Sequence, residues 1–434
     1  MSTPETTFSP DFKPLPYWWD RSPQEPATGE APPREADVLV IGAGYTGLHA
    51  AIQTARAGLS TVVIDAEAAG WGCSTRNGGQ VSTSVKPSFG ALKKRYGRDL
   101  AIAILREGQA SLDHVTAFVR DEQIDCDFSV VGRFHGAHTA RYYDVLARDC
   151  ESRHAGFETG AYVVPRSEQS SELGTNAYFG GAVFPHHASL DPGKYHAGLL
   201  RVARAAGALI VSHCPATDIA RTGAGFEVTT PAGRIRLGKV IVATNGYTGG
   251  LTPWHRRRVI PIGSYVIATE EILPDLMDRL FPTNRILSDT RKLVYYYRPS
   301  PDRKRVLFGG RVSLSETDPK KSGPKLHAEL ARLFPELAAT RISHSWAGTV
   351  AFSFDTLAHC GEDRGLYHAM GYCGSGVGMA GYLGARIGRC AAGLDTDPGA
   401  FSRRQYQTRP FYTGSPWFLA PSVAFFRLRD RLGI

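Results

Sequence analysis

The feature that most constrains this chain is a glycine-rich turn between two short apolar segments near the N-terminus. Residues 37–41 are typical of a buried parallel strand, and Gly42, Gly44 and Gly47 follow them in G-x-G-x-x-G spacing. Apolar residues then recur at helical spacing, and a second apolar segment ends on Asp65. This order predicts a β-α-β unit that binds a dinucleotide.

The three glycines and the aspartate each have a physical role in such a unit. Gly42 permits a tight turn, Gly44 lets the backbone approach a pyrophosphate, and Gly47 lets helix and strand pack closely. The free N–H groups at the start of the helix, and the positive end of its dipole, favour the phosphates. Asp65 is placed to accept hydrogen bonds from both hydroxyls of an adenosine ribose.

A second glycine-rich loop, GWGCSTRNGGQ at residues 70–80, follows the second strand directly. A nicotinamide enzyme would instead continue through further β-α units. The loop combines four glycines with one charged residue, Arg76, which suits a phosphate or the anionic edge of a ring. We therefore expect the loop to lie along the same cofactor, towards its reactive ring, and a flavin explains it better than nicotinamide does.

The segment GVGMAG at residues 376–381 repeats the G-x-G-x-x-G spacing after a strand-like stretch. The chain beyond its helix shows no second strand pattern, so the sequence does not predict a second β-α-β unit or a nicotinamide site. We interpret these glycines as positions of close approach to the flavin ring.

Taken in order, these motifs resemble those of the FAD-dependent glycine/D-amino-acid oxidase superfamily. Further stretches that carry the resemblance are GLLRVARAAGA (198–208), VIVATNGYT (240–248), WAG (346–348) and GYCGSGVG (371–378). The gamma-glutamylputrescine oxidase-like branch is the most similar, because it carries an S-x-R-N-G-G-Q loop of this kind. The resemblance covers residues 15–400, roughly, and is far more specific for the superfamily than for a substrate.

The resemblance implies an α/β fold (α+β overall). Its FAD-binding domain is Rossmann-like, of the glutathione-reductase type, and its substrate domain is built on a large antiparallel sheet. We expect a discontinuous FAD domain at residues 36–90, 160–255 and 345–400. We expect the substrate domain at 91–159 and 256–344, with an N-terminal arm (1–35) and a C-terminal tail (401–434).

The resemblance also implies which residues contact FAD, and the β-rich region supplies candidates for positioning the substrate. The expected FAD contacts are Gly42, Gly44, Tyr45, Thr46, Gly47, Asp65, Ala66, Gly72, Cys73, Ser74, Arg76, Asn77, Gly78, Gly79, Gln80, Ala216, Ala243, Thr244, Asn245, Tyr247, Gly374, Ser375, Gly376, Val377, Gly378 and Met379. The candidate catalytic residues are Tyr295, Tyr297 and Arg311, in a substrate-positioning role. Plain sheet packing is the alternative for the tyrosines.

Two departures from the family pattern narrow the substrate. Members that oxidise amino acids carry an arginine two residues after the W-x-G glycine, where this chain has Val350. Glycine oxidases add an arginine in the next glycine loop, where the nearest match is Gly374. Because both arginines are missing, the carboxylate of a small α-amino acid would have to bind Arg298 or Arg311. We therefore expect an amine without this carboxylate as the substrate.

The expected reaction is oxidation of an amine C–N bond to an imine by hydride transfer to FAD, with O2 as acceptor and H2O2 released. The alternatives are an amino- or imino-acid dehydrogenase that reduces a quinone at a membrane, and a non-catalytic flavin-binding subunit. We expect non-covalent FAD, because Gly348 and Arg76 occupy the positions at which family members tether it. Cys73 and Cys373 remain possible tethers.

Composition sets further limits. The net charge of +9 comes from short, separated basic runs, so no nucleic-acid partner is expected, although such a field attracts an anionic cofactor or substrate. The N-terminus has no secretory pattern, no apolar stretch spans a bilayer, and seven scattered cysteines indicate a reduced, cytoplasmic protein without a metal site. The tail at 402–434 has six arginines and an apolar patch; packing on the protein body is favoured over contact with a membrane surface.

Overall fold

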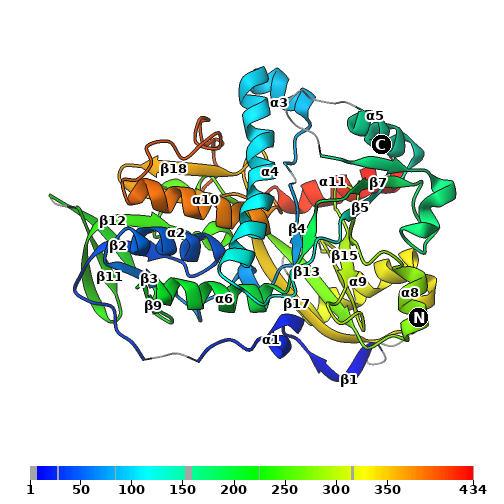
Figure 1. Ribbon diagram of the computed structural model, residues 1–434, viewed down its shortest axis with the longest axis horizontal. Helices are drawn as coiled ribbons and strands as arrows, with labels where there is room; N and C mark the ends of the chain where they lie inside the picture. Colours follow the sequence, from blue (N-terminus) through cyan, green and yellow to red (C-terminus); the bar gives the residue numbers. More distant parts are fainter. Residues whose placement is uncertain are drawn as a thin grey trace.

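The computed structural model describes residues 7–26, 29–83, 85–151, 159–223, 225–313 and 317–433. Two large sheets lie side by side, and the long helix α4 (Arg98–Asp121) stands between them in the view of Figure 1. The mixed α/β architecture confirms the expected fold class.

The first sheet has eight strands and contains the predicted β-α-β unit. Its order is β10-β11-β12-β2-β3-β9, with β19 beside β12 and β18 beside β19. Strands β19, β12, β2, β3 and β9 run parallel, so their carboxyl ends lie at one edge. The bounds are β2 Glu35–Ile41, β3 Thr61–Ile64, β9 Leu209–Val211, β10 Asp218–Thr222, β11 Gly225–Thr230, β12 Gly233–Val242, β18 His359–Asp363 and β19 Leu366–Met370.

Three helices accompany this sheet: α2 (Tyr45–Arg56), α6 (Pro192–Ala205) and α10 (Gly376–Ala391). Glycines let α10 pack directly on α2. A Cβ at Gly384 would lie 2.4 Å from the carbonyl oxygen of Thr46, and one at Gly388 would lie 2.5 Å from that of Ala50. These separations are too short for a side chain, so the glycines of α10 serve helix packing as well as the turn at its start.

The second sheet has nine strands in the order β1-β17-β13-β16-β15-β14-β5-β7-β6. It is mixed rather than antiparallel throughout, because β1 runs parallel to β17 and β5 runs parallel to β14. Helices α8 (Pro274–Leu280) and α9 (Pro319–Leu333) accompany it. The bounds are β1 Phe8–Lys13, β5 Arg133–Gly136, β6 Tyr162–Val164, β7 Gly181–Phe184, β13 Ile260–Thr269, β14 Ile286–Asp289, β15 Tyr296–Pro299, β16 Val306–Gly310 and β17 Ile342–Phe352.

The division between the sheets differs from the expected domain boundaries at two places. Most of β17 lies within 345–400, which was expected in the FAD domain, although β17 belongs to the nine-stranded sheet. Strands β6 and β7 fall within residues 160–255, which the sequence assigned to the FAD domain, yet they pair in the nine-stranded sheet. The short strands β4 (Gln80–Val81) and β8 (Ala188–Ser189) pair with each other. Between them, the chain leaves the eight-stranded sheet, forms β5, β6 and β7 of the nine-stranded sheet, and returns.

The remaining helices are α1 (Tyr17–Arg21), α3 (Phe89–Tyr96), α5 (Ala140–Glu151), α7 (Pro253–Arg256) and α11 (Leu419–Leu432). The tail therefore ends in a helix, α11, of which Val423 is the buried residue. No helix in the described part of the chain is long and apolar enough to cross a lipid bilayer.

Candidate active site

The turn between β2 and α2 has no room for side chains. Gly42 has a φ of +111°, and a Cβ there would lie 2.9 Å from the carbonyl oxygen of Ala243. A Cβ at Gly47 would lie only 1.8 Å from the carbonyl oxygen of Gly42. Gly44 is the N-cap residue of α2 and has no side chain to cap it, so the helix begins with N–H groups that can face an anion.

Asp65 follows β3 and faces the same turn. Its Oδ2 accepts a hydrogen bond of 2.7 Å from the Ala43 N–H, and its Oδ1 accepts one of 3.0 Å from the Glu67 N–H. Burial raises the pKa of this carboxyl, while the two N–H groups oppose that shift. The carboxylate is therefore held beside the glycine turn, where a ribose would have to lie.

The other predicted contacts of this sheet lie at its carboxyl edge, where ligands bind in open α/β sheets. They are Ala66 after β3, Ala216 after β9, Ala243 and Thr244 after β12, and Gly374, Ser375, Gly376, Val377, Gly378 and Met379 around the start of α10. Thr46 of α2 joins this edge to α10, because its hydroxyl lies 2.6 Å from the Tyr372 hydroxyl.

Loop 70–80 runs from this edge to the second sheet. Ser74 Oγ accepts a hydrogen bond of 3.0 Å from Tyr45 N–H, which ties the loop to the start of α2. Asn77 donates to the carbonyl oxygens of Cys73 and Ser74 and accepts from Gly79 N–H. At the far end, Gln80 Nε2 donates to two carbonyl oxygens of the nine-stranded sheet. The loop therefore connects the two halves of the molecule.

Arg76 has protein partners on several sides. Its guanidinium lies 4.7 Å from the centroid of Trp19 and 4.5 Å from that of Trp71. It also donates to the carbonyl oxygens of Trp71 (2.6 Å) and Ala347 (3.1 Å). Burial lowers its pKa. From the sequence we expected Arg76 to bind a phosphate or the edge of a ring. In the structure its contacts are with protein groups, and they stabilise the conformation of the loop.

Tryptophans hold the backbone of this loop, and sequence reasoning treated those of the arm as ordinary packing. The indole of Trp18 donates to the Asn77 carbonyl oxygen (2.8 Å), and that of Trp19 donates to Thr75 Oγ1 (2.9 Å). Trp346 on β17 donates to the Arg76 carbonyl oxygen (2.8 Å). The aromatic cluster in the N-terminal arm was the only sequence signal for these contacts, and it did not indicate that loop 70–80 is the partner.

A third segment, the 3₁₀ turn Asn245–Tyr247, lies next to the glycine-rich segments described above. Asn245 Oδ1 accepts a hydrogen bond of 3.0 Å from Gly371 N–H, before α10. The Tyr247 hydroxyl accepts one of 3.2 Å from Thr349 N–H on β17, and its ring contacts Gly72. The glycine turn, loop 70–80, this turn and the start of α10 therefore surround one region between the two sheets.

Tyr296 and Tyr297 of β15, and Tyr295 directly before it, divide between the two faces of the sheet. Tyr296 faces loop 70–80: its ring would meet a Cβ at Gly78 or at Gly309, and its hydroxyl lies 2.8 Å from Ser264 Oγ. Tyr297 points the other way into an apolar core, where its hydroxyl donates to Tyr178. Tyr295 shares that face. The structure therefore brings Tyr296 to the loop, and not the two candidates beside it.

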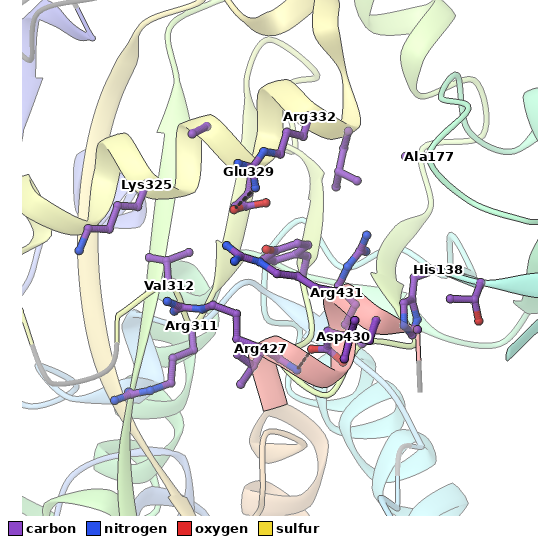
Figure 2. A pocket seen from close by; sticks show the side chains of 18 residues that line it. His138, Ala177, Arg311, Val312, Lys325, Glu329, Arg332, Arg427, Asp430 and Arg431 are labelled. Atoms are coloured by element: carbon purple, nitrogen blue, oxygen red, sulfur yellow. Dashed lines mark hydrogen bonds and ion pairs between the residues drawn. The ribbon is translucent and has the colours of Figure 1, made fainter. Parts of the chain in front are cut away.

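Tyr295 and Arg311 both line a pocket of about 680 Å³ between α9 and α11 (Figure 2). The pocket also contains Glu329 and Arg332 from α9 and Asp430 from α11. None of the glycine-loop residues contributes to it. This pocket is a separate feature from the region between the sheets.

Arg298 is the alternative carboxylate partner that the sequence offered, and its position excludes that role. It is almost fully buried, and Nη1 donates to the carbonyl oxygens of Gly79 (3.0 Å) and Leu190 (2.9 Å). Burial lowers its pKa to about 10. Arg311 Nη1 donates to the Gly263 carbonyl oxygen at 2.6 Å.

The two cysteines in the glycine loops are protonated thiols. Burial raises the pKa of Cys73 to about 11, and its Sγ donates to the Thr349 carbonyl oxygen at 3.0 Å. Burial also raises the pKa of Cys373. A protonated thiol is a poor nucleophile. Across the described residues, no group of three or more histidine, cysteine, aspartate or glutamate side chains is arranged to hold a metal ion.

Known proteins resemble this chain over nearly its full length. It is 31% identical over 429 residues to "Probable oxidoreductase OrdL" of Rhizobium meliloti (strain 1021), covering 95% of this chain and 97% of that protein. It is 29% identical to gamma-glutamylputrescine oxidoreductase of Escherichia coli (strain K12), covering 92% and 93%. Glycine oxidase from Geobacillus kaustophilus shares the fold, with a TM-score of 0.71 and 20% identity over 86% of this chain and 99% of that one.

A family model matches the part of the chain that contains the glycine-rich segments. The family described as FAD dependent oxidoreductase (DAO) matches residues 37–389. This range begins within β2 and ends within α10, so it includes the glycine turn, loop 70–80, the second glycine motif and both sheets apart from β1. The chain therefore belongs to the DAO family and is an FAD-dependent oxidoreductase.

Proposed function

We propose that this enzyme oxidises the C–N bond of an amine to an imine, with O2 as electron acceptor and H2O2 as second product, in the manner of a gamma-glutamylputrescine oxidase. The relative named gamma-glutamylputrescine oxidoreductase supports this reaction class. The observation that carries the amine assignment is Val350, a half-buried apolar residue on β17 where amino-acid-oxidising relatives of the family carry arginine. A carboxylate left unpaired in such a site costs several kcal/mol.

The residues present fit FAD. The start of α2 would hold the pyrophosphate, Asp65 the ribose, and loop 70–80 with the start of α10 the flavin end. Ser375, the N-cap residue of α10, makes no capping hydrogen bond to its helix, so this helix also begins with N–H groups for an electron-rich edge. Bound FAD supplies the acceptor for the hydride on the carbon next to the amine nitrogen.

The chain's own contribution is orientation of the amine. We assign this role to Tyr296, whose hydroxyl is paired with Ser264 on the face towards loop 70–80. Tyr295 and Tyr297 then support the sheet behind it. Arg311 stays a proposed positioning residue: it directly follows β16, two residues beyond Gly309, and it also lines the separate pocket beside Tyr295.

Anaerobic mixing with a set of amines and amino acids tests the proposal. Simple amines and γ-glutamylputrescine should bleach the flavin absorbance faster than glycine, sarcosine or D-alanine. An oxygen electrode then separates an oxidase from a dehydrogenase, because only an oxidase consumes O2 at a matching rate. A flavin that no amine bleaches would support the non-catalytic subunit instead.

The quinone-reducing alternative has one structural observation in its favour. Helix α11 exposes Phe425 (57%), Leu428 (56%) and Leu432 (61%) beside its arginines, a combination suited to a membrane surface. Recovery of the native protein in a detergent-free supernatant would argue against this alternative. The seven cysteines form no disulfide, which supports the proposed cytoplasmic location.

A further inference from the structure

Lys86 lies between the two sheets, beside Gly374 ahead of α10 and Phe352 of β17. It follows β4 in the chain, and its side chain is solvent-accessible. Burial nevertheless lowers its pKa, and Arg133 and Lys292 lower it further. A side chain that is both accessible and desolvated lies in a recess that protein surrounds on most sides.

Lys86 lies beside Gly374, one of the two positions at which the family's arginines are missing, and near Phe352 on the strand that carries the other, Val350. Its Nζ would lie 3.9 Å from a Cβ at Gly374, and it lies 5.5 Å from the ring centroid of Phe352, two residues beyond Val350 on β17. Lys86 makes no hydrogen bond or ion pair with any residue that the structure describes. Its ammonium group therefore lies beside Gly374 and carries a charge that no described residue pairs.

Arg133 on β5 provides a second cation near Lys86. Its guanidinium lies 6.0 Å from the ring centroid of Phe184, which stacks on His187, and His187 Nε2 lies 2.9 Å from the hydroxyl of Thr83, three residues before Lys86. Phe134 and Gly136 face the apolar core of the nine-stranded sheet, so Arg133 and His135 face the recess. Arg133 Nε donates to Ser288 Oγ (2.7 Å), and its Nη2 lies 3.1 Å from His135 Nδ1. These contacts hold the guanidinium in one orientation. Burial lowers the pKa of Arg133 to about 10.

Two desolvated cations near each other are unfavourable unless an anion joins them. The titratable groups that act on Lys86 are Arg133, Lys292 and Cys373, of which two are cationic and the third is a thiol. The carboxylate of Asp289 acts on Arg133, but it forms an ion pair with Arg291. His135 is kept neutral by burial and by the two cations, which lower its pKa well below the usual value. The recess thus has a positive field and a fixed donor set, which is what a carboxylate needs.

We propose that Lys86 and Arg133 form the subsite that binds an anionic group of the substrate, remote from the oxidised C–N bond. The inference rests on the proposed amine oxidation and narrows its substrate to an amine whose far end carries a carboxylate. Positions 350 and 374, which serve a carboxylate next to the reacting carbon in amino-acid oxidases, carry no cation of their own here. Because Lys86 lies beside Gly374, loss of glycine or sarcosine binding in Lys86→Met would overturn the remote assignment.

The test measures anaerobic flavin reduction by γ-glutamylputrescine and by its α-carboxamide, which differ only in the negative charge. In the wild type the carboxylate form should bind more tightly. Lys86→Met should raise its apparent dissociation constant roughly ten- to hundredfold, with little change in the limiting rate, and leave the carboxamide within about twofold. Lys86→Met leaves no described hydrogen-bond partner unpaired, so it should fold. Lys86→Arg should retain most of the binding.

Two further variants complete the design. Arg133→Gln should show the same selective loss, and Lys93→Met, at an exposed site on α3, controls for net charge. Equal binding of the two compounds by the wild type, or an equal loss for both in Lys86→Met, would overturn the subsite.

Titration calorimetry with glutarate separates this inference from the reaction itself. Glutarate should bind the wild type and lose affinity in Lys86→Met, whether or not any amine is oxidised. If no amine reduces the flavin but glutarate behaves in this way, the proposed function fails and the anion subsite stands. If amines reduce the flavin but glutarate does not bind the wild type, the subsite fails and the function stands.

Discussion

Replacing His255 by phenylalanine should make the protein resist acid better. His255 lies in α7 with no exposed surface, between the rings of Trp254 (4.9 Å) and His368 (4.8 Å). Neither ring nitrogen has a hydrogen-bond partner among the described residues. Burial lowers its pKa from 6.5 to about 4, and the positive charge of Arg258 adds to the shift. The folded protein therefore holds this imidazole neutral.

The sign of the pH effect follows from the depressed pKa. Between pH 6.5 and 4 the unfolded chain binds a proton at this site and the folded chain does not, so the stability contribution is complete above pH 6.5 and falls with decreasing pH. One pKa unit is worth about 1.4 kcal/mol. The contribution lost between pH 7 and pH 5 is therefore about 2 kcal/mol, and it approaches about 3 kcal/mol near pH 4.

Urea unfolding followed by tryptophan fluorescence at pH 7 and pH 5 measures this difference. His255→Phe keeps an aromatic ring of similar shape, so it should match the wild type at pH 7 and lose about 2 kcal/mol less on going to pH 5. His186→Phe, at an exposed position, is the matched control and should follow the wild type. Equal losses in His255→Phe and the wild type would refute a neutral, buried His255.

Three further predictions concern the cofactor and the substrate. Gly47→Ala should yield colourless protein, because its Cβ would lie 1.8 Å from the Gly42 carbonyl oxygen and would force α2 away from β2; Gly90→Ala, with open space around it, should retain flavin absorbance. Acid precipitation should leave a yellow supernatant and a colourless pellet, because the Cys73 thiol is protonated; a yellow pellet would show a covalent tether. Val350→Arg should not improve oxidation of amines and should create weak O2 uptake with glycine or sarcosine. A wild type that already prefers those amino acids would contradict the amine assignment.

The β-α-β unit could be predicted from sequence because its determinants are local. Strand, turn and helix lie within 30 or so residues, and the glycines are required by contacts inside that segment or with the next strand, as at Gly42 and Gly47. The structure confirms the predicted strands as β2 and β3 and the predicted helix as α2. The same reasoning located the start of α10.

The setting of Arg76 could not be predicted, because its partners come from distant parts of the chain. Trp19 belongs to the N-terminal arm and Ala347 to β17, and neither is linked to Arg76 by any local pattern. A residue type indicates what a side chain can bind, here an anion, a carbonyl oxygen or an aromatic face. Which of these it meets depends on the packing of the two sheets.

The C-terminal tail shows how a correct rule can be applied at the wrong position. Two prolines in the apolar patch argue against a long amphipathic helix, and the 14-residue helix α11 begins at Leu419 and includes Pro421. Pro421 falls in the first turn, where the backbone N–H has no partner within the helix, so the missing donor is not a penalty. Further along, the same residue would have ended the helix.

The tyrosines of β15 mark the limit of pattern reasoning at the substrate site. Alternation correctly separates Tyr296 from Tyr295 and Tyr297, but it does not say which set faces the cofactor, because a shift of one residue exchanges the two faces. The choice is made by neighbours on other strands: Gly309 on β16 leaves space for the Tyr296 ring, and Phe308 draws Tyr297 into the core. Lys86 was missed for a related reason. Its loop has no periodic pattern, and the lysine gains significance only when Gly374 and Phe352 are placed beside it.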